Sequence, residues 1–173
     1  MKNLLAIFFF SMIISFSPQT FSQTEMKLKE GIKAPNFILQ NANGKYFKLS
    51  SFKGISPVVI YFYPKAGSSG CTKQACGIRD DMKSFKDKNI IVLGISVDSK
   101  REIKKFVSEN NLNFPLLSDV NRVVTKKYGV LRDDGKSKRI TFIIDKDGMI
   151  AKIIEVNDVS SHAKEVFEIA SRL

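Results

Sequence analysis

The two cysteines of this 173-residue chain, Cys71 and Cys76, both lie in the segment YFYPKAGSSGCTKQACGIRD, where an apolar run gives way to helical composition. The N-terminus of a helix offers backbone N–H groups without intrahelical partners and the positive end of the helix dipole. Both features favour a thiolate over a thiol, and the thiolate is the reactive form of cysteine. Cys71 therefore has the features expected of a nucleophile.

The neighbouring elements must hold Cys71 in this position. Val58 to Tyr63 is a short run of β-branched and aromatic residues, which predicts a strand buried on both faces. Pro64 ends that strand because proline has no N–H to donate, and the small residues 67–70 form a loop. A helix is predicted from Cys71 onward, with this cysteine in the first turn.

A structural disulfide between Cys71 and Cys76, or a pair of inert buried thiols, is the alternative interpretation. The spacing of five residues argues against a structural disulfide. On a continuous helix it gives a rise of about 7.5 Å and a rotation of about 140° beyond a full turn, so the Cα atoms are about 8 to 9 Å apart. Disulfides usually need less than about 7 Å. A bond would require local unwinding of the helix, which fits a disulfide that is made and broken during catalysis.

The same residues carry a resemblance to a known family. Pro64, Ser68 and Cys71, followed by Cys76, resemble the PxxxTxxC active site of the bacterioferritin-comigratory-protein (Q-type) peroxiredoxins, which have a second cysteine five residues on. The stretches GISVDS, NFPLLSD and RITFIIDKDGMI are also similar to that family. The resemblance runs from about residue 27 to the C-terminus. Ser68 departs from it, because most members have threonine there; the hydroxyl is kept and the methyl group is lost.

The resemblance implies a thiol peroxidase and a role for each of five residues. Cys71 would be the peroxidatic cysteine, which becomes a sulfenic acid, and Cys76 the resolving thiol, which converts it to an intramolecular disulfide. Ser68 would bind the peroxide through its hydroxyl, Arg139 would bring a planar cation to the pocket, and Pro64 would shield the pocket from water. An external thioredoxin-like dithiol would then reduce the disulfide, and no cofactor is required.

Composition alone favours less specific roles for the polar residues. In a chain with 28 lysines and arginines, Arg139 is predicted to be a surface residue, and Ser68 a turn or helix-cap residue; the family pattern reverses both interpretations. His162, the one histidine, is predicted to lie on the surface and not to act as a catalytic base. Two cysteines and one distant histidine cannot supply the four ligands of a structural zinc site, so no metal is expected.

Two other classes of function have to be weighed. An exported thiol-disulfide oxidoreductase of thioredoxin type would have a CxxC motif, whereas four residues separate the cysteines here. A non-catalytic basic binding protein is the second alternative, since the net charge is +11. The lysines, however, are spread along the chain, and no basic run is interleaved with aromatic residues as in single-strand binders. We expect no nucleic-acid partner.

The N-terminus has the pattern of a signal peptide. A basic start at Lys2 is followed by an apolar run from Leu4 to Phe16 and then by polar residues. This run is shorter than the about 20 residues that a membrane span needs. We expect a signal peptide over residues 1–22, export to the bacterial periplasm and no stable membrane association afterwards; an uncleaved anchor is the alternative.

Residues 23–173 are long enough for one domain with a sizeable core. Hairpins are predicted at Asn43-Gly44 and Asp147-Gly148, and helices over 100–110, 120–128 and 161–173. Strands and helices in this order predict a layered α/β domain. The resemblance implies a thioredoxin-like fold with peroxiredoxin extensions, in which a central mixed sheet is flanked by helices, and a monomer.

Overall fold

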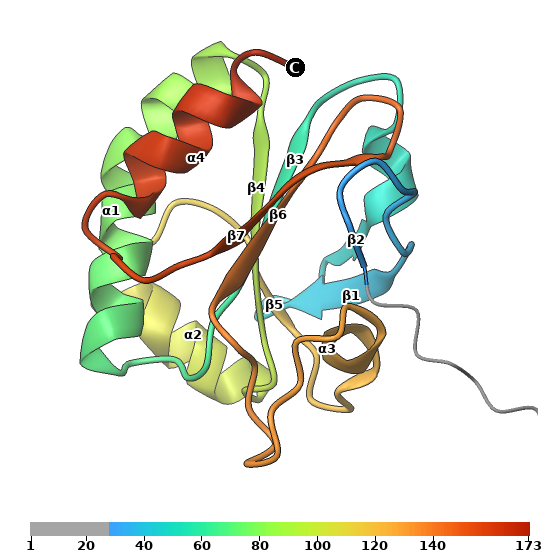
Figure 1. Cartoon of the computed structure of the whole chain (residues 1–173). Helices are drawn as coiled ribbons and strands as arrows, with labels where there is room; N and C mark the ends of the chain where they lie inside the picture. The colour runs from blue at the N-terminus through green and yellow to red at the C-terminus, as the bar shows by residue number, and fades with distance from the viewer. Residues whose placement is uncertain (1–27) are drawn as a thin grey trace, which may run out of the picture.

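The computed structural model describes residues 28–173, so the signal peptide predicted over 1–22 lies outside the described residues. The elements follow in the order β1 (Ile38–Asn41), β2 (Tyr46–Lys48), the 3-10 helix η1 (Leu49–Phe52), β3 (Val58–Phe62), α1 (Ser69–Asp87), β4 (Ile91–Ser96), α2 (Lys100–Glu109), β5 (Leu116–Ser118), α3 (Val123–Lys127), β6 (Ile140–Ile144), β7 (Ile150–Glu155) and α4 (His162–Ala170) (Figure 1). No helix in this part of the chain is long and apolar enough to cross a membrane.

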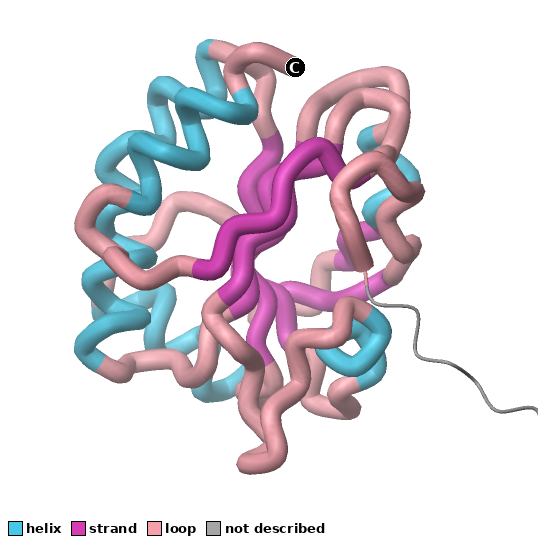
Figure 2. Tube along the Cα trace, in the orientation of Figure 1, coloured by secondary structure: helices cyan, strands magenta, loops and turns pink. Residues whose placement is uncertain are grey.

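Seven strands form one mixed sheet in the order β2-β1-β5-β4-β3-β6-β7. At its centre, β3 pairs in parallel with β4 and antiparallel with β6. All five residues of β3 are buried, as its apolar composition predicts for a strand covered on both faces. Figure 2 shows the strands passing through the middle of the molecule with helices on either side. The predicted mixed sheet flanked by helices is confirmed.

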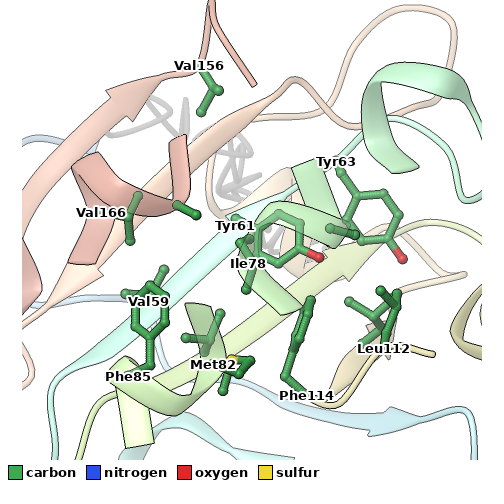
Figure 3. Close-up of a cluster of buried hydrophobic side chains, with 14 of the residues drawn as sticks. Val59, Tyr61, Tyr63, Ile78, Met82, Phe85, Leu112, Phe114, Val156 and Val166 are labelled. Carbon is green, nitrogen blue, oxygen red and sulfur yellow. The ribbon is translucent and has the colours of Figure 1, made fainter. Parts of the chain in front are cut away.

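Two hydrophobic cores lie on opposite faces of this sheet. Residues of β3 alternate between them: Val59 and Tyr61 belong to the first core, and Ile60 and Phe62 to the second. The helices α1, α2 and α4 cover the first core, whereas η1 and α3 cover the second (Figure 1). Figure 3 shows the first core, with the rings of Tyr61 and Tyr63 among apolar side chains from the helices and from the segment that follows α2. The N-terminal end of α1 therefore lies on the same face of the sheet as α4.

The helix predicted over 120–128 is shorter than expected, and its start was wrong. The carboxylate of Asp119 accepts hydrogen bonds from the backbone N–H of Thr125 at 2.6 Å and from its hydroxyl at 2.7 Å. Arg122 adopts a left-handed backbone conformation with φ of 59°. These interactions form a turn after β5, because an aspartate side chain competes with helical hydrogen bonds, and α3 begins only at Val123.

The prediction that His162 is a surface residue was also wrong, because its exposed fraction is 0%. Within α4, His162, Ala163, Val166 and Ala170 are all buried. This spacing places them on one face of the helix, which packs against the first core. Both ring nitrogens of His162 have hydrogen-bond partners, so the polar ring can be buried without a large desolvation penalty.

Candidate active site

Cys71 lies in the first turn of α1, as predicted, and its exposed fraction is 1%. The helix begins after a short loop that follows the carboxyl end of β3. Ser68 occupies the N-cap position, but its side chain makes no capping hydrogen bond; its hydroxyl donates instead to the carbonyl of Lys65 at 3.1 Å. The cap residue therefore leaves the first N–H groups of α1, including that of Cys71, available to a bound group.

The loop between β3 and α1 is held at the carboxyl ends of neighbouring strands. The N–H of Ala66 donates to the carboxylate of Asp98 at 2.8 Å, and Asp98 lies just beyond β4. The hydroxyl of Ser118, at the end of β5, donates to the carbonyl of Asp98 at 2.7 Å. Pro64 starts the loop and is half-buried. The position of the cysteine-bearing helix is thus set by contacts that cross the sheet.

Arg139 approaches Cys71 from the segment that precedes β6. Its Nη2 donates to the sulfur of Cys71 at 3.3 Å, and its Nη1 donates to Oε1 of Gln74 at 2.6 Å. Gly70 makes room for the guanidinium, because a Cβ at this position would come within 3.3 Å of Nη2. The guanidinium thus places a positive charge and an N–H donor in direct contact with the sulfur.

A buried chain of hydrogen bonds continues from Gln74. Its Nε2 lies 3.2 Å from Nδ1 of His162, and Nε2 of that ring lies 2.9 Å from the hydroxyl of Thr141. Gln74, Thr141 and His162 have exposed fractions of at most 1%. Burial, together with the positive charge of Arg139, lowers the pKa of His162 to about 4. The ring is neutral at physiological pH, so Arg139 and not His162 supplies positive charge to Cys71.

Cys76 faces a different neighbour. It is half-buried, and its sulfur lies 4.0 Å from Oδ1 of Asn110, just beyond the end of α2. Arg79 lies one turn further along α1 and donates to the carbonyl of Asn110 at 2.8 Å. Both cysteines are free thiols on one continuous helix. A disulfide between them therefore needs unwinding of α1, as the spacing indicates.

The residues 31–153 match the AhpC/TSA family. The chain belongs to this peroxiredoxin family. It is 45% identical over 144 residues to the putative peroxiredoxin bcp of Buchnera aphidicola subsp. Schizaphis graminum, an alignment that covers 79% of this chain and 90% of the relative. It is 41% identical over 142 residues to peroxiredoxin Bcp of Escherichia coli strain K12, with 78% and 90% of the two chains covered.

Solved structures agree with these relatives. Peroxidoxin BcpB from Mycobacterium tuberculosis superposes with a TM-score of 0.79 at 34% identity, covering 84% of this chain and 98% of the other. A PrxQ variant from Xylella fastidiosa superposes with a TM-score of 0.77 at 25% identity, covering 82% and 94%. The predicted resemblance to Q-type peroxiredoxins and the thioredoxin-like fold are confirmed. This peroxiredoxin is a thiol peroxidase, and its family implies a peroxide substrate and a thioredoxin-like reductant. The alternative of an exported thiol-disulfide oxidoreductase is not favoured.

The five residues singled out in the sequence have different positions in this peroxiredoxin. Cys71 and Arg139 are in contact, although they are 68 positions apart in the sequence. Ser68 and Pro64 lie on the loop that leads into α1, with Ser68 exposed. Cys76 lies on the same helix as Cys71 but contacts Asn110 instead of the guanidinium. Among residues 28–173, no group of three or more His, Cys, Asp or Glu side chains is arranged to hold a metal ion.

Four residues around the site were missed by the sequence analysis: Gly70, Gln74, Thr141 and His162. The sequence contained a signal for Gln74, a polar residue at the spacing of the apolar stripe of α1; the buried residues of that helix are Cys71, Gln74, Ala75, Ile78, Met82 and Phe85. A polar residue in such a stripe needs a buried partner. In this peroxiredoxin the partners of Gln74 are Arg139 and His162.

His162 is expected to make this peroxiredoxin less stable in acid. An unfolded histidine titrates near pH 6.5, whereas burial and Arg139 lower the pKa of His162 to about 4. Between these values the unfolded chain binds a proton that the folded chain does not. The free energy of unfolding therefore falls with decreasing pH, by about 1.4 kcal/mol per pH unit at the steepest point. Above about pH 6.5 the ring is neutral in both the folded and the unfolded chain, and His162 no longer makes the free energy of unfolding depend on pH.

Urea unfolding at about pH 7 and about pH 4.5 would measure this effect, with His162→Asn as the control because aspartates and glutamates titrate in both proteins. The wild type should lose about 2 kcal/mol more than the variant between the two pH values. Equal losses would show that the histidine titrates alike in the folded and unfolded chains.

Proposed function

We propose that Cys71 is the peroxidatic nucleophile of this thiol peroxidase. Its thiolate attacks one oxygen of the peroxide, so that an S–O bond forms as the O–O bond breaks. The departing oxygen takes up a proton and leaves as water or an alcohol. The observation that supports this proposal most strongly is the 3.3 Å contact between Nη2 of Arg139 and the sulfur. A fixed cation at this point stabilises both the thiolate and the charge that develops on the departing oxygen.

Ser68, Pro64 and the helix N-terminus complete the peroxide site in this proposal. The hydroxyl hydrogen of Ser68 is donated to Lys65, which leaves the oxygen lone pairs free to accept the O–H of a peroxide. The N–H of Cys71, which the Ser68 side chain does not cap, donates to the same peroxide. Pro64, half-buried at the start of the loop, shields the reacting atoms from water.

Cys76 resolves the oxidised cysteine. Its thiol attacks the sulfenic sulfur of Cys71, an S–S bond forms and water leaves. A thioredoxin-like dithiol then reduces the disulfide by exchange and is itself oxidised. The first turns of α1 must unwind for the two sulfur atoms to meet, since helical geometry separates their Cα atoms by about 8 to 9 Å.

Mass spectrometry of the prereduced protein after one equivalent of hydrogen peroxide tests this cycle. The expected product has lost two hydrogen atoms and yields one linked pair of peptides containing Cys71 and Cys76. Amide hydrogen exchange at the start of α1 should be faster in this product than in the reduced protein, because the helix has unwound there. A product that has gained one oxygen atom, with no linked peptides, would rule out Cys76 as the resolving thiol.

Arg139→Lys is expected to lower the second-order rate constant for hydrogen peroxide by about 100-fold. Lysine keeps the charge but lacks the planar fork that reaches the sulfur and Gln74 together. Loss of one fixed donor at a developing charge typically costs a factor of 100 to 1,000, about 3 kcal/mol. Stopped-flow kinetics would measure the rate, with Arg132→Lys as the control because that arginine is 48% exposed. Equal rates for both variants would remove Arg139 from the mechanism.

We also propose that the chain is exported to the bacterial periplasm and acts there as a monomer. The support for export is the basic and then apolar pattern of residues 1–22. Expression of the full chain in a bacterium with two membranes, followed by fractionation and N-terminal sequencing, tests it. A periplasmic product that begins near residue 23 is expected, and light scattering should give the mass of one chain. A cytoplasmic product with an intact N-terminus would contradict export.

A further inference from the structure

A chain of hydrogen bonds leads from Cys71 through the half-buried Arg139 to the buried side chains of Gln74 and His162, and ends at Thr141. The chemistry of each group determines which atoms carry hydrogen. A guanidinium has only donors. The atom of Gln74 that faces Arg139 at 2.6 Å must therefore be the carbonyl oxygen. The amide group at the other end of Gln74 faces the histidine.

The orientation of Gln74 decides the tautomer of His162. The amide nitrogen is a donor, so Nδ1 of the ring, at 3.2 Å, must accept and carries no hydrogen. The hydrogen of the neutral ring is then on Nε2, which donates to the hydroxyl of Thr141 at 2.9 Å. The network thus allows one tautomer only.

A protonated ring does not fit this network. With hydrogen on both nitrogens, the N–H at Nδ1 would face the N–H donors of the Gln74 amide. If the amide rotated to turn its oxygen toward the ring, its nitrogen would face the N–H donors of Arg139 instead. Of the side chains around the ring, Arg139 is charged, whereas Gln74, Thr141 and the ring of Tyr61, centred 6.2 Å away, are neutral. Burial raises the pKa of Tyr61 well above its usual value, so that ring brings no negative charge to an imidazolium.

We propose that His162 is a positioning residue for peroxide reduction: as a neutral imidazole with its hydrogen on Nε2, it fixes the amide of Gln74 so that the carbonyl oxygen holds Arg139 on Cys71. This role rests on the proposed function of Cys71 and Arg139. A flexible arginine side chain loses rotamer entropy when it is fixed in one position. The 2.6 Å hydrogen bond to Gln74 restrains one end of its fork, and His162 keeps that acceptor turned toward the guanidinium.

Nuclear magnetic resonance tests the tautomer without any activity measurement. Because the chain contains one histidine, its ring nitrogens give a single pair of signals after ¹⁵N labelling of histidine. The expected spectrum of the reduced protein at pH 7 shows hydrogen on Nε2 and a non-protonated Nδ1, with no titration down to about pH 5. Hydrogen on Nδ1, or titration near pH 6.5 as in a free histidine, would overturn the proposal.

Gln74→Glu tests the same contact by changing the partner of Nδ1 of His162. A carboxylate can only accept, so Nδ1 of His162 must then carry a hydrogen. The ring should therefore carry hydrogen on Nδ1, either as the other neutral tautomer, with the Thr141 hydroxyl donating to Nε2, or as a cation beside the carboxylate. A ring whose Nδ1 still lacks hydrogen at pH 5 in this variant would show that the two side chains are not coupled. This measurement requires only that the variant folds, which the same spectra establish.

Stopped-flow kinetics with two substitutions of His162 test the effect on the reaction. His162→Leu removes the acceptor and should lower the rate constant for hydrogen peroxide by about tenfold, which corresponds to about 1.4 kcal/mol. His162→Asn places an oxygen near the position of Nδ1 and should restore the rate to within about threefold of the wild type. Wild-type rates in His162→Leu would overturn the positioning role.

Arg139→Lys distinguishes failure of this inference from failure of the proposed function. If Arg139→Lys lowers the rate and His162→Leu does not, the positioning role fails alone. If neither variant changes the rate, the proposed function of Arg139 fails as well, and the inference fails with it.

Discussion

Cys71→Ser is expected to reduce the rate constant for hydrogen peroxide by about 10⁴-fold or more, the scale on which loss of a catalytic nucleophile acts. A serine hydroxyl fits the buried site, which is only 1% exposed, but it stays un-ionised at neutral pH and is a weak nucleophile. The cation of Arg139 remains beside it with no thiolate to stabilise. Stopped-flow measurement of peroxide consumption by the prereduced variant gives the rate directly.

Two controls accompany Cys71→Ser: a check that the variant is folded, and the residual peroxide consumption by its remaining thiol, Cys76. The circular dichroism spectrum of Cys71→Ser should match the wild type, because the substitution changes one atom and removes no large apolar group. The variant retains Cys76, so any residual consumption reports a thiol that lacks the contact with Arg139. Consumption at the wild-type rate would discard Cys71 as the nucleophile.

Cys76→Ser is expected to consume one equivalent of hydrogen peroxide at close to the wild-type rate and then to stop. The first step uses only groups at the start of α1 and the guanidinium, whereas Cys76 lies beside Asn110. Without a resolving thiol the sulfenic acid of Cys71 persists, and excess peroxide converts it to sulfinic acid. Single-turnover kinetics, followed by mass spectrometry, would show one added oxygen atom first and two later.

A protein dithiol is the appropriate reductant for the steady-state comparison, because a small thiol in excess can reduce a sulfenic acid directly. Turnover of Cys76→Ser with a thioredoxin-like protein should be lost, while the wild type continues. Asn110→Ala is a matched control, since it changes the side chain that contacts Cys76 and keeps the thiol. Sustained turnover of Cys76→Ser with the protein reductant would assign resolution to another group.

The burial of the hydrogen-bond network between Cys71 and Thr141 limits which substitutions the site tolerates. Cys71, Gln74 and His162 are at most 1% exposed, and Arg139 between them is half-buried. A buried polar group that loses its partner costs about 1 to 3 kcal/mol. Substitutions of Gln74 or Thr141 should therefore affect stability as well as rate, which is why a spectroscopic measurement on His162 is more informative than activity alone.

Much of the fold follows from local patterns in the sequence. The run of β-branched and aromatic residues at Val58 to Tyr63 predicts the central strand because it is apolar at every position, and such a strand must be covered on both faces. Gly44 and Gly148 adopt φ of 82° in the two hairpins, a conformation that glycine allows. The place of Cys71 in the first turn of α1 follows in the same way, from a strand, a stop and a short loop.

The composition of the site depends on contacts that no local pattern contains. Arg139 meets Cys71 because β6 pairs with β3, and the pairing brings the residue before one strand to the loop after the other. From composition alone Arg139 would be a surface arginine, and only the family resemblance indicated otherwise. Its partner Gln74 could be suspected from the apolar stripe of α1, but not identified.

His162 shows most clearly which contacts the sequence alone could not predict. By itself the sequence determined the strands, the helices, the hairpins and the place of Cys71 at the start of a helix, because each depends on residues close together in the chain. Only the tertiary structure decided that α4 packs with its first residue against the sheet, so that a histidine with no local signal of burial lies between Gln74 and Thr141. The physical reason is that a polar side chain can be buried only where partners satisfy it, and those partners come from distant elements of the chain.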